Sequence, residues 1–76
     1  MDTQEFIKNF ANQFEDTDAS EITMETSFRD IDEWDSLVAL AILNMIAKKY
    51  GVKLTFDDMR QTNTVQELFN VVESKK

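Results

Sequence analysis

Apolar residues recur at helical spacing near the start of the chain. The apolar positions between Phe6 and Phe14 form one stripe of a helix with 3.6 residues per turn. This spacing predicts an amphipathic helix over residues 2–14. Asp2, followed three residues later by Glu5, is typical of a capping box at its start.

The middle of the chain contains a second and more apolar helix, predicted over residues 36–50. From Leu37 to Ala47 only Asn44 is polar. A β-strand is the competing interpretation of such a run, but the alanines, leucines and methionine favour a helix. Asp35 is suited to cap its start, and Gly51 is suited to the left-handed residue that ends it.

Two further capping patterns follow. Thr55 and Asp58 predict a short helical turn, and Thr64 with Glu67 predicts the start of a last helix that runs toward the C-terminus. We therefore expect an all-α fold, a four-helix bundle of three long helices and one short helix. No strand-pairing partners are evident. At 76 residues, the chain is expected to form a single domain, residues 1–76.

The segment between the first two long helices, residues 15–35, shows no period. It holds nine acidic residues, and its apolar residues are widely spaced. Because it contains neither glycine nor proline, we interpret it as a docked loop with a short helical turn, not as a flexible linker. The apolar residues expected to anchor it are Ile22, Met24, Phe28, Ile31 and Trp34.

Composition excludes several classes of function. With no histidine and no cysteine, the chain has no disulfide, no imidazole base and no thiolate or imidazole ligand for a metal. A net charge of −7 disfavours nucleic acid. The acids from Asp30 onward fail the spacing of a calcium loop. The N-terminus lacks a secretory pattern, and the longest apolar run is too short to span a membrane, so we expect a cytoplasmic protein.

Ser36 stands out as a candidate for modification. It lies in the first turn of the best-capped helix, where unpaired backbone N–H groups favour an attached phosphate. The chain has no histidine or other base to activate its hydroxyl as a nucleophile, so Ser36 would be an acceptor for a group that another enzyme attaches. The alternative is that Ser36 only begins the helix.

At these residues the sequence resembles the acyl carrier protein family. Asp35-Ser36-Leu37 is similar to the Asp-Ser-Leu signature of the family, and Trp34 precedes it as in many discrete carriers. Residues 50–54 resemble the family's exit from the second helix, and residues 64–68 resemble the start of its last helix. The resemblance covers nearly the whole chain.

The resemblance implies that Ser36 carries covalent 4′-phosphopantetheine, donated from coenzyme A by a phosphopantetheinyl transferase. The chain would then be a monomeric carrier and not an enzyme, presenting acyl thioesters to loading and processing enzymes. Asp35 would cap the helix and contribute to transferase recognition, and Leu37 would anchor the first turn in the core. Residues that either shelter the acyl chain or form ordinary core are Phe28, Leu37, Leu40, Ile46 and Leu68.

One departure from the family concerns charge. Residues 1–36 have a net charge of −9 and residues 37–76 a net charge of +2. The helix after Ser36 lacks the acids that usually dock on partner enzymes, since Val38, Ala41, Ala47 and Lys48 stand at those positions.

Electrostatic steering would instead come from the loop, chiefly through Asp30, Asp32, Glu33 and Asp35. We therefore expect a specialised carrier whose partners contact Val38, Ala41 and Met45, unless Val38 and Ala41 simply pack against the loop. Alternatives are an aminoacyl or peptidyl carrier, and an unmodified helical interaction module.

Overall fold

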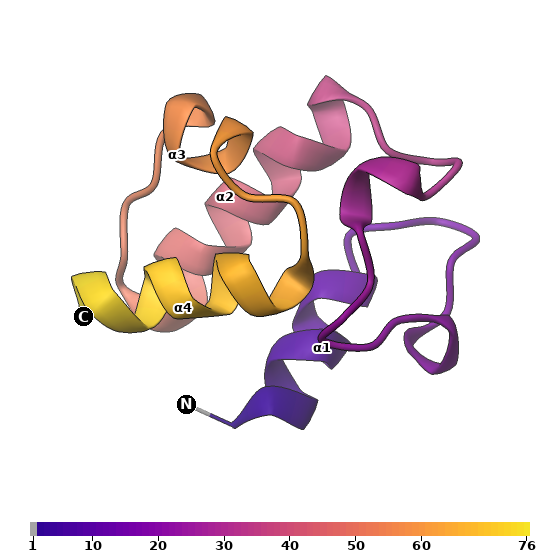
Figure 1. Cartoon of the computed structure of the whole chain (residues 1–76), viewed down its shortest axis with the longest axis horizontal. Coiled ribbons are helices and arrows are strands. Elements are labelled where there is room, and N and C mark those ends of the chain that lie inside the picture. Colours follow the sequence, from indigo (N-terminus) through magenta and orange to yellow (C-terminus); the bar gives the residue numbers. More distant parts are fainter. Residues whose placement is uncertain (1) are drawn as a thin grey trace.

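The computed structural model describes residues 2–76 and confirms the all-α architecture (Figure 1). Its four α-helices are α1 (Thr3–Ala11), α2 (Ser36–Tyr50), α3 (Phe56–Arg60) and α4 (Val65–Lys75). Two short 3₁₀ turns, Ala19–Glu21 and Phe28–Asp30, lie within the long loop between α1 and α2. The described residues form no extended strand, but one isolated antiparallel β-bridge joins Ser27 and Thr64, which the sequence did not predict.

Helix α1 is shorter than the sequence predicts. The Asp2 side chain accepts hydrogen bonds from the backbone N–H groups of Gln4 and Glu5, so Asp2 is the N-cap. The predicted capping box is only half formed, because within residues 2–76 the Glu5 carboxylate does not accept from the Asp2 N–H. The helix ends at Ala11 and not at Phe14, because the backbone hydrogen bonds there reach three residues back and not four. The Phe14 N–H bonds to the Ala11 carbonyl, three residues back, at 3.0 Å. Phe14 is still buried, so the apolar stripe continues past the end of the helix.

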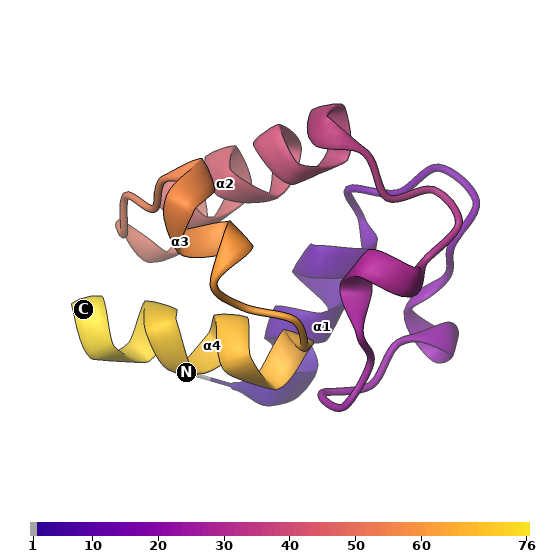
Figure 2. The same ribbon diagram turned by 45° about the horizontal axis from the view of Figure 1, so that its top comes forward.

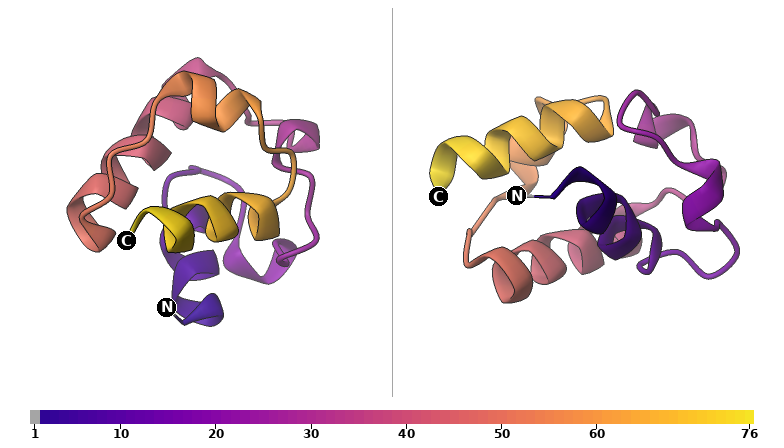
Figure 3. Two further views of the ribbon diagram at one scale, coloured as in Figure 1. Left: turned by 60° about the vertical axis from the view of Figure 1, so that its left-hand side comes forward. Right: turned by 90° about the horizontal axis from the view of Figure 1, so that it is seen from below.

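Helix α2 has the predicted bounds. The Asp35 carboxylate accepts a 2.8 Å hydrogen bond from the Val38 N–H, and Gly51 ends the helix with φ 70°. Seen from below in Figure 3, α1 lies between α4 and α2. Asn9 of α1 is buried and donates a 3.0 Å hydrogen bond to the Tyr50 hydroxyl. This bond joins α1 to the end of α2.

Aromatic rings link the core to the loop. The Phe6 ring contacts Phe69 edge to face, at 5.4 Å between centroids. Phe10 lies 6.1 Å from Phe28, and Phe28 lies 4.7 Å from Trp34. Such aromatic pairs add directional contacts to apolar burial. The fully buried side chains are Phe6, Phe10, Phe28, Ile42, Ile46, Val65, Leu68 and Val72.

The long loop is docked, as the sequence predicts. Ile22 and Phe28 are buried, and the other three anchors are half-buried. The loop backbone also pairs with the start of α4, where Gln66 N–H donates to the Met24 carbonyl at 2.7 Å. Figure 2 shows the loop passing close to that end of α4. Across residues 2–76, no helix combines the length and hydrophobicity needed to cross a bilayer.

Candidate cofactor-attachment site

Ser36 begins α2, at the upper end of that helix in Figure 1. Its side chain is exposed. Within the described chain no group forms a hydrogen bond with its hydroxyl, whereas Ser20 and Ser74 donate theirs to neighbouring oxygens. Ser27 is half-buried and itself forms the β-bridge with Thr64. Ser36 is thus the serine whose oxygen is both accessible and free.

The segment that leads to Ser36 is held against the core. The Trp34 ring packs against Phe28 in a tilted arrangement and also contacts Phe14, at 6.5 Å between centroids. The backbone N–H of Trp34 donates to the Ile31 carbonyl at 2.9 Å. With the Asp35 cap at the next position, these contacts fix the point at which the loop enters α2.

Glu33 connects the two ends of the long loop through hydrogen bonds. Its carboxylate accepts hydrogen bonds from the backbone N–H of Glu15 at 2.9 Å and from the Thr17 hydroxyl at 2.6 Å. It also accepts from the Asp16 N–H. The Thr17 hydroxyl is the main cause that lowers the pKa of Glu33, with the backbone donors adding to it and partial desolvation opposing it. Glu33 therefore has a structural role that the sequence did not reveal.

The expectation for Leu37 is wrong: its side chain is 76% exposed. Residues advance by about 100° per position along a helix, so Leu37 lies on the face opposite the buried Ile42 and Ile46. Leu40 is also exposed, at 44%, so neither leucine lines the interior. Phe28, which like Ile46 and Leu68 was expected as lining or core, is fully buried with them. An acyl shelter inside the bundle would require these buried side chains to part.

The six residues predicted to recognise partners come together in the structure. They line one surface pocket of about 620 Å³ that lies between the loop and α2. The pocket takes its acids and Trp34 from the loop and its other apolar groups from α2, where Val38 and Ala41 are half-buried. These six residues are Asp32, Glu33, Asp35, Leu37, Val38 and Ala41. Met45, also expected to contact partners, is buried, so that expectation is wrong.

Sequence reasoning missed two arginines beside Ser36. Arg29 and Arg60 line a second pocket, of about 290 Å³, to which Ser36 itself contributes. They stand 31 positions apart in the sequence, and no local pattern connects them. The only available signal was that the chain has no other arginine.

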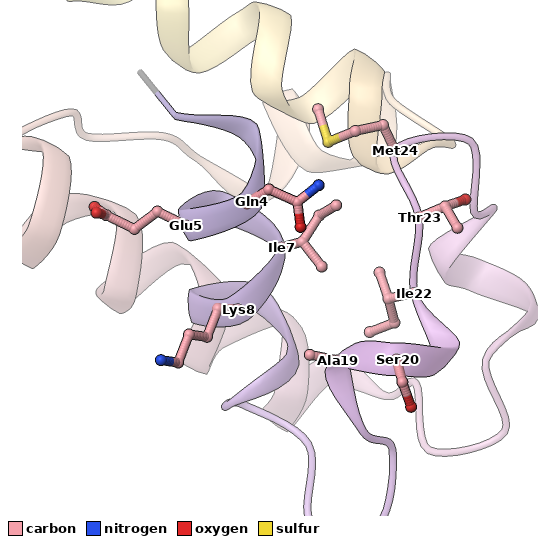
Figure 4. Close-up of a pocket in the computed structure, with 9 residues that line it drawn as sticks. All are labelled: Gln4, Glu5, Ile7, Lys8, Ala19, Ser20, Ile22, Thr23 and Met24. Atoms are coloured by element: carbon pink, nitrogen blue, oxygen red, sulfur yellow. The ribbon is translucent and has the colours of Figure 1, made fainter.

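A larger pocket, of about 730 Å³, lies away from Ser36 between α1 and residues 19–24 (Figure 4). Ile7 points toward Ile22 and Met24 across it, whereas Glu5 and Lys8 point away. No residue of the Ser36 region lines it. Residues 2–76 also contain no cluster of side chains able to hold a metal ion.

Comparison with known proteins decides the family. The family model described as the phosphopantetheine attachment site matches residues 5–72. The chain belongs to this family of carriers. The solution NMR structure of a holo acyl carrier protein from Geobacter metallireducens is similar, with 30% sequence identity and a TM-score of 0.77. The match covers 99% of this chain and 86% of that one. No curated protein matches the chain.

Membership of the family confirms the resemblance seen in the sequence. The protein is a carrier, and its cofactor is covalently attached 4′-phosphopantetheine. The structure fits that group. Within residues 2–76 the exposed Ser36 hydroxyl has no hydrogen-bond partner; it stands at a capped helix start, and open pockets lie on two sides of it.

Proposed function

We propose that Ser36 is the attachment residue and that the carrier presents acyl groups as thioesters on the phosphopantetheine arm. The observation that carries this proposal is the contrast among the four serines. Ser36 alone combines exposure, a free hydroxyl and the Asp-Ser-Leu signature. The chain has no cysteine, so the thiol that holds the acyl group comes from the arm.

Attachment needs a second protein. The Ser36 oxygen forms a bond to phosphorus in the pyrophosphate of coenzyme A, the phosphorus–oxygen bond toward the nucleotide breaks, and adenosine bisphosphate leaves. The hydroxyl proton must go to a base. The chain has no histidine, and the nearby Asp35 already caps α2. The base is therefore supplied by the transferase, and the carrier itself performs no catalysis.

Partner enzymes dock, in this proposal, on the pocket between the loop and α2. Asp32 and Asp35 offer charge for steering. Leu37, Val38 and Ala41 offer apolar contact. Because acids are absent from α2, partners would need an apolar patch edged by basic residues near the loop, which suits dedicated partners of a specialised carrier. We further propose that the carrier acts as a cytoplasmic monomer, with residues 1–76 as its single domain.

Intact mass spectrometry tests the attachment. The chain is co-expressed with a broad-specificity phosphopantetheinyl transferase, and we expect the mass to increase by one phosphopantetheine unit. Ser36→Ala should abolish the increase, whereas the matched control Ser20→Ala should leave it intact. Full modification of Ser36→Ala would show that another residue is the acceptor, and no adduct under conditions that modify a known carrier would refute the proposal.

A further inference from the structure

The pocket that Ser36 shares with two arginines is chemically distinct from the proposed docking pocket. It lies between the end of the loop, the first turns of α2 and helix α3. Asp35 also lines this pocket, and its carboxylate accepts a hydrogen bond from the Val38 N–H. The cations of the pocket are Arg29 and Arg60.

Arg29 is fixed in place, and no carboxylate within residues 2–76 pairs with it. One of its terminal nitrogens donates to the carbonyls of Met59 at 2.8 Å and Thr62 at 3.1 Å. Its Nε donates to the Thr62 carbonyl at 3.3 Å and to the Asn63 side chain at 3.2 Å. The guanidinium also lies over the Phe28 ring, 5.6 Å from its centre. Such a bonded and stacked guanidinium is pre-organised for a further acceptor.

The second terminal nitrogen of Arg29 makes no hydrogen bond within residues 2–76. Neutral carbonyls satisfy the other donors of Arg29 but do not cancel its charge. The result is a held, uncompensated cation in a segment whose overall charge is strongly negative. A guanidinium in this state favours an oxyanion, and its planar donors match phosphate geometry.

Arg60 adds a second cation that is able to move. It pairs with Asp57 at 2.6 Å, and both side chains are more than 70% exposed. Exposed pairs of this kind contribute little to stability. Arg60 therefore gives up its partner at low cost when a stronger anion enters the pocket.

We propose that Arg29, assisted by Arg60, forms a binding subsite for the phosphodiester group that links the arm to Ser36. This inference rests on Ser36 being the attachment residue. The phosphodiester would place two charge-bearing oxygens at the pocket that Ser36 and the arginines line together. Binding there directs the first part of the arm toward α3 and away from the docking pocket.

The chain suits a direct test, because Arg29 and Arg60 are its only arginines. Nitrogen-15 NMR spectra therefore contain two arginine side-chain Nε–H signals. Arg60→Lys removes one of them and so assigns both. Spectra are compared between the apo protein and the holo protein, each purified without a partner enzyme. We expect the Arg29 signal to shift on conversion to the holo form, and to stay in place when Ser36→Ala is treated with the transferase.

Two further measurements identify the source of the anion and its contribution to thermal stability. Inorganic phosphate added to the apo protein at equimolar concentration should not shift the Arg29 signal, because only attachment gives a high local concentration. Conversion to the holo form should raise the Tm by about 1–6 °C. Arg29→Gln should lose that rise, whereas the control Lys53→Gln, on another pocket, should keep it.

The outcomes separate the two proposals. If mass spectrometry confirms the arm on Ser36 but the Arg29 signal does not move, the subsite is refuted and the carrier function stands. Saturation of the shift by equimolar inorganic phosphate would also overturn the assignment to the arm. If Arg29→Gln does not fold, the wild-type spectra still decide the question. If no arm is found on Ser36, the proposed function itself has failed.

Discussion

Both oxygens of the Glu33 carboxylate accept hydrogen bonds from the backbone N–H of Asp16, at 3.1 and 3.0 Å. Seventeen positions separate the two residues. The contact joins the start of the long loop to the segment just before Ser36. The position of Ser36 therefore depends on an ionised side chain that the sequence assigned only to the steering of partners.

Glu33 makes the stability of the carrier depend on pH. Its pKa is lowered in the folded chain, first by the Thr17 hydroxyl. A lowered carboxyl pKa stabilises the fold fully above the unfolded value, about 4.3 for glutamate. That stabilisation is lost as pH falls through the lower folded value. We expect Glu33→Gln to unfold more readily at pH 7 and to lose part of the acid dependence, measured by urea denaturation between pH 3 and 7.

The matched control for this experiment is Glu25→Gln in the same loop. The carboxylate of Glu25 makes no hydrogen bond within the described chain, so this variant should keep the wild-type acid dependence. Part of the dependence should survive in Glu33→Gln, because hydrogen bonds also lower the pKa values of Asp18 and Asp58. An identical acid limb in Glu33→Gln and wild type would contradict the role given to Glu33.

Trp34 should contribute more than a solvent-exposed loop residue. Its ring is half-buried against Phe28 and Phe14. Truncation of a fully buried aromatic costs about 3–5 kcal/mol, so for this half-buried ring we expect Trp34→Ala to lower the free energy of unfolding by about 1–3 kcal/mol. Chemical denaturation measures the loss. Trp34→Phe keeps a ring and should recover most of it, and a loss below about 0.5 kcal/mol in the alanine variant would refute the anchoring role.

Gly51 should resist substitution because of its backbone alone. Its φ is 70°, and a Cβ added there would meet no atom within 4 Å. The cost of Gly51→Ala is therefore left-handed strain without a steric clash, about 1–2 kcal/mol. Gly51→Asn should cost less, because asparagine tolerates this conformation better. Thermal unfolding of the three proteins gives the order, and an alanine variant as stable as wild type would contradict it.

Partner binding should depend on the apolar side of the docking pocket. Val38→Glu would place a charge at the half-buried, apolar part of this pocket, and an unpaired charge buried against an apolar partner surface is costly. We expect Val38→Glu to reduce the kcat/KM of a phosphopantetheinyl transferase by about tenfold, equivalent to about 1.4 kcal/mol. Lys48 is exposed and lies outside that pocket, so Lys48→Glu should have a smaller effect. Equal rates for Val38→Glu and wild type would count against the apolar docking face.

Local signals explain what the sequence could predict. The bounds of α2 followed from Asp35 and Gly51, because a cap and a left-handed stop act over a few residues. The capping boxes of α3 and α4 formed as expected for the same reason. The end of α1 was misplaced because the apolar period runs on to Phe14, although the backbone has already left the helix.

Contacts between distant segments account for the rest. Leu37 was assigned to the core because apolar residues surround it in the sequence, but a helix apolar on most sides does not reveal which side faces inward. The hydrogen bonds of Glu33 and the arrangement of Arg29 beside Ser36 depend on how the loop folds back. A segment without a period carries no local signal of such contacts.

The contact of Trp34 with Phe28 also gives the protein a built-in optical reporter. The chain has a single tryptophan, and it lies half-buried two positions before Ser36. The emission maximum of a partly shielded indole responds to changes in solvent contact. Tryptophan fluorescence of the unlabelled protein therefore reports on the surroundings of Ser36, the proposed attachment residue, and we expect it to follow attachment of the arm and partner docking in real time.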